Sequence, residues 1–581
     1  MDTNNITITN EQVGDVPLLI ARQREMGISE LIDKHFEPHG NWQGASYGEL
    51  AEVWLSYILS KGDHRLNRME SWYTERQTTI NHYGKKELTP NDFRDDRLAI
   101  LLNALSDDTK WSAFEKDLNQ RTIRVYNLET KQVRLDATTV SGHWQVTENG
   151  LFQYGHSKAH RPDLPQLKVM LSTLDPLGIP LVTTVVSGNR ADDPLYIPAV
   201  KAVRESLNQQ GLLYVGDVKM SSKETRTEIQ KGGDYYLSPL SATQMPRDKM
   251  LELIAPMLQT PSLLTKVEYT KSDGKVIHIA DAFEQEVMHT ESVDGTKVEW
   301  TERLIVTRSF AYANAQLKST ERRLTLAERE IVELPEPKQG KSRPKNMEEY
   351  QLAIEKILER RQVKGLLLVN FETIVHEKPV RRYGDNPARV DRIEEICIHV
   401  SRDQAALDAY EQTLGWRVYV SNTTSSQLSL CDAILAYRGQ YIVERAFGRL
   451  KGKPLSLSPM YLEKDDHATG LVRLLSIGLR VLSLLEHSVR SALKKSNTKI
   501  AGLYAGNPKR KTHRPSATLI LQAFSNIILT IIHDDLSTSY HLTPLSHTQS
   551  HLLQLLGLDD SLYLSLIQDH SWNLDTYLHE P

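Results

Sequence analysis

Apolar side chains recur with helical spacing through the first 125 residues. Tyr47–Leu59 and Leu98–Leu105 have the three-to-four-residue apolar repeat that places these side chains on one face of a helix. Between them, Thr89-Pro90-Asn91-Asp92 combines a hydroxyl and a proline in the order typical of a helix start. The pattern predicts a helical N-terminal domain over residues 1–125.

From Thr122 onward the apolar positions alternate, as they do in strands. The pattern predicts strands at 133–140, 167–174 and 180–186, a helix at 193–207, a strand at 212–218, a helix at 221–231 and a strand at 235–237. This succession predicts a mixed α/β sheet. Its order is that of ribonuclease-H-like domains, in which the fourth strand lies beside the first. We therefore interpret residues 126–245 as the first part of a ribonuclease-H-like catalytic core.

Residues 246–405 interrupt this α/β pattern. Strands are predicted at 299–307 and 366–375, and a charged helical stretch at 316–362 lies between them. We interpret this region as a mostly β insertion with a charged helical excursion. The α/β pattern resumes over 406–500, the second part of the core, which includes a long apolar helix at 468–485.

A helical C-terminal region is predicted over residues 501–581. Its most apolar tract, Ala517–Ile532, contains three polar residues and is shorter than the roughly 20 residues needed to span a bilayer. We expect it to be a buried helix rather than a membrane anchor. The predicted fold class is therefore α/β, with a ribonuclease-H-like mixed sheet, a mostly β insertion, and helical regions at both ends.

Composition limits the class of protein. A chain of 581 residues is too long for one core, and its 40% apolar and 25% charged residues are those of an ordinary globular protein. Two cysteines, Cys397 and Cys431, exclude a disulfide framework, and the N-terminus lacks the apolar core of a secretory signal. We expect a cytoplasmic protein without membrane contact. Because the net charge is −4, any nucleic-acid contact must come from local basic patches.

One short basic segment, Tyr437–Lys451, contains a single carboxylate, that of Glu444. The cationic residues of this segment and of the two residues that follow it are Arg438, Arg445, Arg449, Lys451 and Lys453. On one continuous helix, Tyr437, Glu444 and Lys451 share a stripe, because seven residues are nearly two turns. A break at Gly439 would move Tyr437 off that stripe. A lone acid among such cations suits a metal-binding carboxylate that faces a nucleic-acid backbone.

Two aspartates of the predicted sheet are candidate partners for Glu444. Asp136 lies within the first strand and Asp217 closes the fourth. Because these strands are predicted neighbours, both carboxylates are expected at the same end of the sheet, where the helix of Glu444 can pack across them. Three carboxylates favour Mg²⁺ or Mn²⁺ as the bound ion. The alternative for each aspartate alone is a turn former or a helix cap, both common at strand ends.

These residues and their surroundings resemble the DDE transposases of bacterial insertion sequences, in the insertion-sequence-four-like group. The third acid of that group lies in a Tyr-Arg-Glu-Lys signature, whose positions here are Tyr437, Gln440, Glu444 and Lys451. Gln440 stands at the arginine position and lacks the bidentate cationic grip of a guanidinium on phosphate. The resemblance extends to Tyr154–Leu171, Ser187–Asp193 and the stretch FGRLKGKPL after Glu444.

The resemblance implies a DNA transposase. Such an enzyme binds the terminal inverted repeats of its element, hydrolyses a strand at each end and joins the freed 3′-hydroxyls to target DNA. It implies that Asp136, Asp217 and Glu444 are the catalytic metal ligands for Mg²⁺ or Mn²⁺. It also implies that Tyr437 and Lys451 contact phosphate near the cut. Gln440, at the arginine position, and Arg445, on an adjacent face where it can substitute for that arginine, complete the expected DNA contacts of the signature region.

The same resemblance implies partners and a location. The N-terminal domain would bind DNA or dimerise, and a homodimer or higher oligomer is expected because two element ends must meet in one complex. The expected location is the bacterial cytoplasm, at the nucleoid. Two alternatives stay open: a catalytically inactive DNA-binding derivative, which Gln440 leaves possible, and a metal-dependent DNA nuclease without strand transfer.

Further candidates lie outside the signature. Trp416 is interpreted either as an aromatic that stacks on a flipped base or as a core tryptophan at a strand end. Lys158 and Arg161 are expected near the DNA backbone. His156 and His160 are four residues apart and could bind zinc if helical, but no cysteine is near, so we interpret them as partners of these cations.

Overall fold

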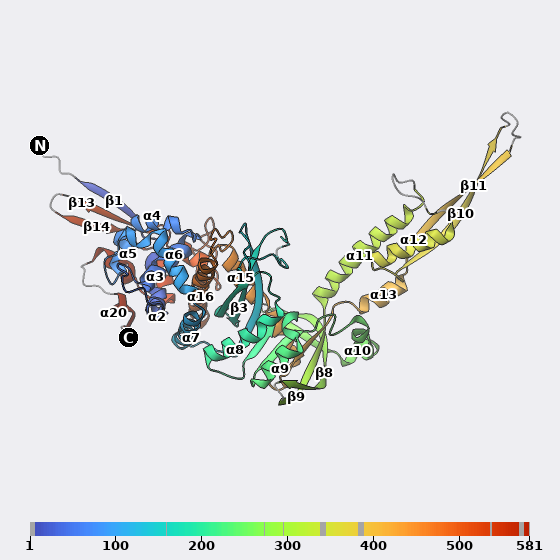
Figure 1. The fold of residues 1–581 in the computed structure, drawn as a ribbon, viewed down its shortest axis with the longest axis horizontal. Coiled ribbons are helices and arrows are strands. Elements are labelled where there is room, and N and C mark those ends of the chain that lie inside the picture. The colour runs from blue at the N-terminus through green and yellow to red at the C-terminus, as the bar shows by residue number, and fades with distance from the viewer. Residues whose placement is uncertain are drawn as a thin grey trace. The chain divides into compact units, whose positions relative to one another are not determined.

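The computed structural model describes residues 6–158, 160–271, 274–293, 296–336, 344, 346–381, 389–534, 537–568 and 574–579 (Figure 1). The chain forms two compact units. The first unit comprises Met1–Ser238, Thr290–Trp300 and Ala436–Pro581. The second unit comprises Pro239–His289 and Thr301–Leu435. The candidate site residues Asp136, Asp217 and Glu444 all belong to the first unit.

Helices follow one another through the N-terminal part of the first unit, as predicted. They are α1 (Val16–Glu25), α2 (Ile28–His35), α3 (Tyr47–Lys61), η1 (Leu66–Arg68), α4 (Met69–Thr74), α5 (Gln77–Tyr83), η2 (Pro90–Phe93), α6 (Asp95–Leu105) and α7 (Asp108–Val125).

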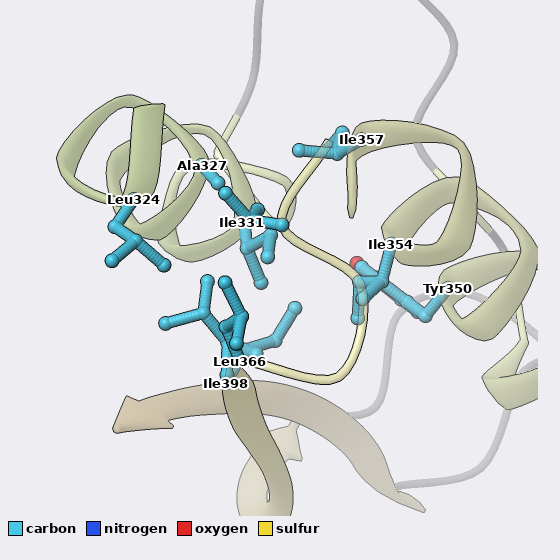
Figure 2. Close-up of a cluster of buried hydrophobic side chains, with 10 residues drawn as sticks. Leu324, Ala327, Ile331, Tyr350, Ile354, Ile357, Leu366 and Ile398 are labelled. Carbon is cyan, nitrogen blue, oxygen red and sulfur yellow. The ribbon is translucent and has the colours of Figure 1, made fainter. Parts of the chain in front are cut away.

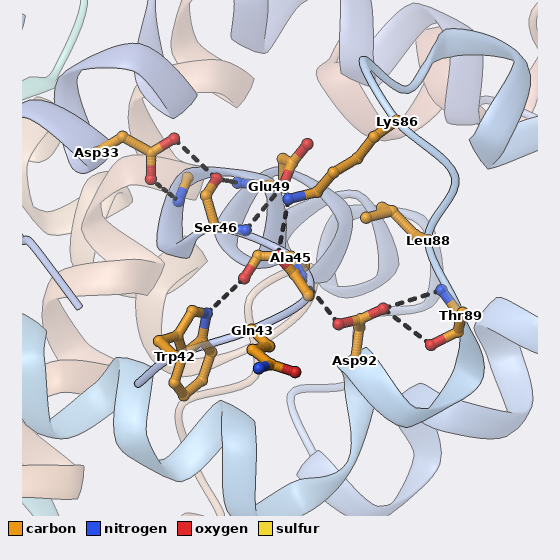
Figure 3. Close-up of polar contacts among 12 residues, drawn as sticks. Asp33, Trp42, Gln43, Ala45, Ser46, Glu49, Lys86, Leu88, Thr89 and Asp92 are labelled. Atoms are coloured by element: carbon orange, nitrogen blue, oxygen red, sulfur yellow. Dashed lines mark hydrogen bonds and ion pairs between the residues drawn. The ribbon is translucent and has the colours of Figure 1, made fainter. Parts of the chain in front are cut away.

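A capping box fixes the start of α3 (Figure 3). The Ser46 hydroxyl accepts from the Glu49 amide, and the Glu49 carboxylate accepts from the Ser46 amide at 2.8 Å. Asp33 of α2 accepts from the Ser46 hydroxyl and from the Gly48 amide, each at 2.7 Å, which ties α2 to α3. Each cap of this kind stabilises a helix by about 1 kcal/mol.

The predicted sheet is present in the first unit. Its strands are β2 (Gln132–Ser141), β3 (Gln166–Leu174), β4 (Ile179–Ser187), β5 (Leu213–Gly216) and β6 (Tyr235–Pro239), in the spatial order β4-β3-β2-β5-β6. β2, β3 and β4 pair antiparallel, whereas β5 pairs parallel with both β2 and β6. The connecting helices are η3 (Asp193–Leu195), α8 (Tyr196–Leu207), η4 (Val218–Ser221) and α9 (Lys223–Lys231). The predicted placement of the fourth core strand beside the first is confirmed.

The long apolar helix predicted at 468–485 is α16 (Asp465–Lys495). It packs against α6 and β4. A Cβ at Gly470 would clash with the Leu102 carbonyl oxygen, so glycine is required for this close approach. In length and composition α16 could cross a membrane, but 94% of its most apolar window is buried inside the protein. It is therefore a core helix.

The predicted helix at 517–532 is wrong. The chain forms only α17 (Ala517–Gln522), then turns and enters β13 (Ile528–His533). Ser525 and Asn526 favour a turn, and the β-branched residues that follow favour a strand. β13 pairs antiparallel with β1 (Thr7–Gln12) and with β14 (Thr538–Leu542), so the terminal regions also contain a small sheet.

The remaining C-terminal elements are helical, as predicted. They are α18 (His547–Leu555), α19 (Ser561–Leu564), η6 (Ser565–Ile567) and α20 (Leu574–His579).

The second unit combines antiparallel strands with helices. β7 (Thr265–Thr270) pairs with β8 (Val276–Val293), and β9 (Thr296–Ser309) pairs with β12 (Trp416–Ser421). β10 (Leu367–Val380) and β11 (Arg389–Arg402) form a separate two-stranded ribbon. The helices are α10 (Arg247–Gln259), η5 (Pro261–Leu263), α11 (Phe310–Val332), α12 (Met347–Arg360) and α13 (Gln404–Gln412).

A hydrophobic cluster joins α11, α12 and the β10–β11 ribbon (Figure 2). Leu324 and Ile331 of α11 meet Ile354 of α12 and Ile398 of β11 in this cluster. The charged stretch predicted at 316–362 therefore folds as two amphipathic helices whose apolar faces form a local core.

Candidate active site

Asp136 and Asp217 lie side by side where β5 ends. The last paired row of the parallel β2–β5 ladder is Leu135 with Gly216. The next residue along the chain is an aspartate in both cases, Asp136 within β2 and Asp217 just after β5. Neighbouring strands are only about 4.8 Å apart. The two carboxylates are close enough to repel each other, since Asp217 raises the pKa of Asp136. The structure thus brings together the two aspartates that the sequence paired.

The Asp136 carboxyl is mostly buried, with 17% of its side chain exposed. Burial raises its pKa to about 6; Asp217 and Asp192 add to the rise, whereas Lys158 and the Ala137 amide oppose it. The Ala137 amide donates to Asp136 Oδ1 at 2.8 Å. A divalent cation would relieve this unfavourable pairing of buried negative charges.

Asp217 lies one residue beyond β5 rather than in the strand. It is the N-cap of η4, and its Oδ1 accepts from the Lys219 amide at 2.9 Å. Tyr196, at the start of α8, donates its buried hydroxyl to the same oxygen at 2.6 Å. Burial, followed by the charges of Asp217 and Asp136, raises the pKa of Tyr196 well above its usual value, so its hydroxyl keeps its proton for this hydrogen bond.

Lys158 lies against the acidic pair. Its ammonium is 3.7 Å from Asp136 Oδ1 and 3.1 Å from Asp192 Oδ2, and it donates to the Ala137 carbonyl at 2.5 Å. Asp192 is held in turn by the buried Lys168 of β3 at 2.6 Å. In this structure Lys158 is therefore a counter-ion of the carboxylates, and its expected contact with the DNA backbone stays a prediction.

Glu444 is exposed in the first turn of α15 (Tyr441–Lys451). The opposite face of α15 is buried through Val443, Ala446, Phe447 and Leu450, and the helix packs against β2. At its other end, Lys451 donates to Thr138 Oγ1 at 2.7 Å and to the Thr139 carbonyl at 3.3 Å. Thr138 follows Asp136 by two residues on the same face of β2. The helix that carries Glu444 thus lies along the strand that carries Asp136.

The three acids do not yet form a closed ligand set. Over the described ranges, no three His, Cys, Asp or Glu side chains lie close enough together to hold a metal ion. The donor chemistry nevertheless fits Mg²⁺ or Mn²⁺, since the adjacent pair is oxygen-only and electrostatically unfavourable when metal-free.

The helix is interrupted at Gly439 and Gln440, so the signature residues do not lie on one stripe of a single helix. Tyr437 lies in α14 (Leu430–Arg438), whereas Glu444 and Lys451 lie in α15. The expectation of a continuous stripe is therefore wrong for Tyr437. Near the interruption, Arg134 of β2 donates to the Ala436 carbonyl at 2.7 Å, as does the Gly439 amide at 3.1 Å. A Cβ at Gly439 would clash with the same guanidinium nitrogen, so glycine leaves room for it.

Gln440 is the N-cap residue of α15, and its side chain forms no cap hydrogen bond. Its Oε1 is buried and has no hydrogen-bond partner in the described part of the chain. Arg445 is half-exposed and pairs with the buried Glu486 of α16 at 3.1 Å. Arg161 is exposed and pairs with Asp163 at 2.7 Å.

Trp416 lies in the hydrophobic core of the second unit. It is 6% exposed, packs with Ile254, Val306 and Val418, and donates its indole N–H to the Gln412 carbonyl at 3.0 Å. This placement favours the core interpretation over base stacking. His156 and His160 lie in a loop rather than on a helix, so the helical spacing that zinc binding needed is absent.

Sequence reasoning missed Arg134, Asp192 and Tyr196. Asp192 and Tyr196 are four residues apart, which places both on one face of the η3–α8 turn. Asp192 acts on Asp136 through Lys158, and Tyr196 acts on Asp217 directly. Asp192 lies within the segment Ser187–Asp193 that carries the resemblance, so that segment was the available signal for it.

Comparison with known proteins places this site in a family. The family model described as Transposase DDE domain matches residues 129–479, which include all three acids. No curated protein matches the chain significantly. One solved structure that it resembles is the piggyBac transposase synaptic complex with hairpin DNA, at 8% identity and a TM-score of 0.33, over 83% of this chain and 77% of that one. That weak likeness carries no argument. Because the matched domain spans more than half of the chain, the protein belongs to the family of DDE-domain transposases.

Proposed function

We propose that this protein is the transposase of a bacterial insertion sequence, which cleaves DNA at the element ends and transfers the 3′-hydroxyls to target DNA. The observation that carries the proposal is the Asp136–Asp217 pair at the end of adjacent strands, with the Glu444 helix laid along one of them. The strand order β4-β3-β2-β5-β6 supports a ribonuclease-H-like core, and Tyr437, Glu444 and Lys451 support the insertion-sequence-four-like group.

Asp136, Asp217 and Glu444 would hold Mg²⁺ or Mn²⁺. Such ions, when bound, activate a water or 3′-hydroxyl nucleophile and stabilise the leaving oxygen of phosphodiester attack. The chain's own groups orient the acids: Tyr196 fixes one oxygen of Asp217, and the Ala137 amide fixes one of Asp136. Lys451 beside Thr138 supplies a cation next to Asp136 for the DNA phosphate.

Double-stranded DNA is the proposed partner, in the form of terminal inverted repeats and target. An oligomer is proposed because both ends must be held together for joining. The proposed location is the bacterial cytoplasm, at the nucleoid.

A strand-joining assay tests this function. Sequencing the DNA that flanks the gene should first identify matched inverted repeats, which define the substrate. A labelled duplex with that end and a free 3′-hydroxyl is then incubated with plasmid and Mg²⁺. We expect labelled plasmid, formed because the 3′-oxygen attacks a target phosphorus and a target 3′-oxygen leaves. Cleavage without joining would identify a nuclease, and gel retardation without either would identify an inactive DNA-binding derivative.

Replacing Tyr196 with phenylalanine tests the positioning of Asp217. This change removes the 2.6 Å hydrogen bond and keeps the ring. We expect the Mg²⁺ concentration for half-maximal cleavage to rise about 10-fold to 100-fold, as is typical when a group that orients a metal ligand is removed. The measurement is a Mg²⁺ titration of the cleavage rate.

A matched control is Tyr214→Phe, a buried tyrosine of β5 whose hydroxyl faces the Val200 carbonyl. Its Mg²⁺ requirement should stay that of the wild type. Equal shifts in both variants would assign Tyr196 a purely structural role.

A further inference from the structure

A groove of about 780 Å³ lies within the first unit, beside the C-terminal end of α15. One wall comes from the α3–α4 region, between Tyr57 and Glu75, and the other from the segment Gly452–Tyr461 that follows α15. We call it the α15 groove. Its two walls are separated by almost 400 residues of sequence and are brought together by the fold.

Cationic side chains predominate among the charged residues of the α15 groove. Its lining contains two acidic side chains, Asp63 and Glu75, and four cationic ones, Lys61, Arg65, Arg68 and Lys453. The acids are already engaged. Asp63 pairs with Arg65 at 2.8 Å, and Glu75 pairs with Arg76 at 3.0 Å.

Two of these cations have no carboxylate partner among the described residues. Arg68 and Lys453 form no ion pair there, and both are exposed, whereas the charges of Asp15 and Glu75 act on the exposed Lys61. Uncompensated cations that line a concave surface focus positive potential on it. This arrangement suits an anionic ligand that runs through the groove.

A buried histidine lines the same groove. His64 is 4% exposed, and its ring faces the Ser456 backbone without reaching full hydrogen-bond geometry to any described residue. Burial lowers the pKa of His64 more than Asp63 and the Ser456 backbone raise it, so the ring is neutral near pH 7.

The α15 groove begins one residue after the helix whose last residue reaches the candidate active site. Lys451, the last residue of α15, reaches Thr138 two residues beyond Asp136. Gly452 and Lys453 follow directly in sequence and line the groove. A DNA strand whose phosphate lies near Asp136 would therefore meet Lys453 next, since two residues of chain span only about 7 Å.

We propose that the α15 groove binds the phosphodiester backbone of the DNA strand that leads away from the cleavage site. Lys453 and Arg68 contact its phosphates from opposite walls, with Lys61 beside them. This inference rests on the proposed function and adds to it the path of the DNA across the first unit. It also assigns a DNA contact to the predicted N-terminal domain, through Lys61 and Arg68.

The test is the double variant Arg68→Ala/Lys453→Ala of the full chain. The probe is a fluorescein-labelled mixed-sequence duplex, titrated by anisotropy at several salt concentrations. We expect the Kd to rise roughly tenfold and the slope of log K against log salt to fall by about 0.9 for each phosphate that is no longer neutralised. The charge-retaining variant Arg68→Lys/Lys453→Arg should bind nearly as the wild type does.

The matched control is Lys110→Ala/Arg124→Ala, which removes the same two side-chain types from the exposed surface of α7. It should leave both the Kd and the salt slope unchanged. Equal effects of the two double variants, or no effect of the groove variant, would overturn the groove proposal.

Cleavage of the element-end duplex separates this proposal from the proposed function. We expect the groove variant to raise KM and to keep kcat, because its residues bind DNA away from the metal ligands. If the wild type cleaves and the groove variant shows wild-type KM, the groove proposal fails and the function stands. If the wild type neither binds nor cleaves DNA, both fail.

Discussion

Replacing Asp136 or Asp217 with asparagine, or Glu444 with glutamine, is expected to reduce DNA cleavage by more than about a hundredfold. Loss of a group that merely orients a metal ligand costs about 10-fold to 100-fold, so loss of the ligand charge itself should cost more. Each substitution keeps the side-chain size and removes one negative charge. The measurement is single-turnover cleavage of the labelled element-end duplex in Mg²⁺, with binding followed by gel retardation and expected to be retained.

Glu148→Gln is the matched control, because Glu148 is an exposed acid of the same unit that is not one of the three candidates. It should cleave at the wild-type rate. A variant of Asp136, Asp217 or Glu444 that also did so would remove that residue from the site. Glu444 is the most informative, because its side chain is exposed and outside any metal-binding cluster of the described residues.

Stability measurements distinguish loss of charge from loss of fold in the Asp136 variant. The folded-state pKa of about 6 exceeds the usual 3.8, so ionisation of Asp136 opposes folding. The stability that the protonated Asp136 carboxyl allows is fully present below the unfolded-state pKa. It is lost as the pH rises through about 6, where this carboxyl ionises in the folded protein. Without metal at pH 7.5, Asp136→Asn should therefore raise the free energy of unfolding, by about 3 kcal/mol. The gain should shrink toward pH 4 in urea titrations, and a loss of stability at pH 7.5 would contradict the electrostatic account.

Local pattern and a topological rule were enough to predict the Asp136–Asp217 pair. Each strand had a clear alternating or apolar run, and the order of strands and helices made the fourth strand a neighbour of the first. β2 and β5 pair in parallel, with Leu135 opposite Gly216. The register therefore places the next residues, Asp136 and Asp217, beside each other.

Long-range contacts account for what the sequence did not predict. The sequence named Gly439 as a place where the helix could break, but not the contact there of Arg134, which lies 302 residues before the Ala436 carbonyl that it binds. The role of Lys158 depends on Asp192 and Asp136 meeting across separate segments. β13 was predicted as helix because its partner strand β1 lies at the other end of the chain. None of these interactions has a period or a spacing that a short stretch of sequence reveals.

Replacing Arg480 with methionine is expected to destabilise the first unit by about 3–5 kcal/mol. Arg480 of α16 is fully buried and donates to Glu115 of α7 at 2.8 Å and to the Pro180 carbonyl of β4 at 2.9 Å. Burial raises the pKa of Glu115, and Arg480 opposes that rise. Without Arg480 the Glu115 carboxyl would be buried and unpaired, which is the costly case for an ion pair. The measurement is urea denaturation of the full chain, followed by circular dichroism.

Two variants test whether the loss of stability in Arg480→Met comes from the buried, unpaired carboxyl of Glu115. In Arg480→Met/Glu115→Leu both charges are gone, and stability should return toward the wild-type value because buried pairs replaced by apolar residues are often neutral. Asp108→Asn is the matched control. Asp108 of α7 pairs with Arg473, which is a buried arginine of α16 like Arg480, but the Asp108 side chain is itself 90% exposed. Its loss should cost less than about 1 kcal/mol. If the double variant stayed as unstable as Arg480→Met, the cost would come from poorer packing and from the missing hydrogen bond to Pro180. The arginine would then join α16 to the edge of the catalytic sheet, independently of the charge on Glu115.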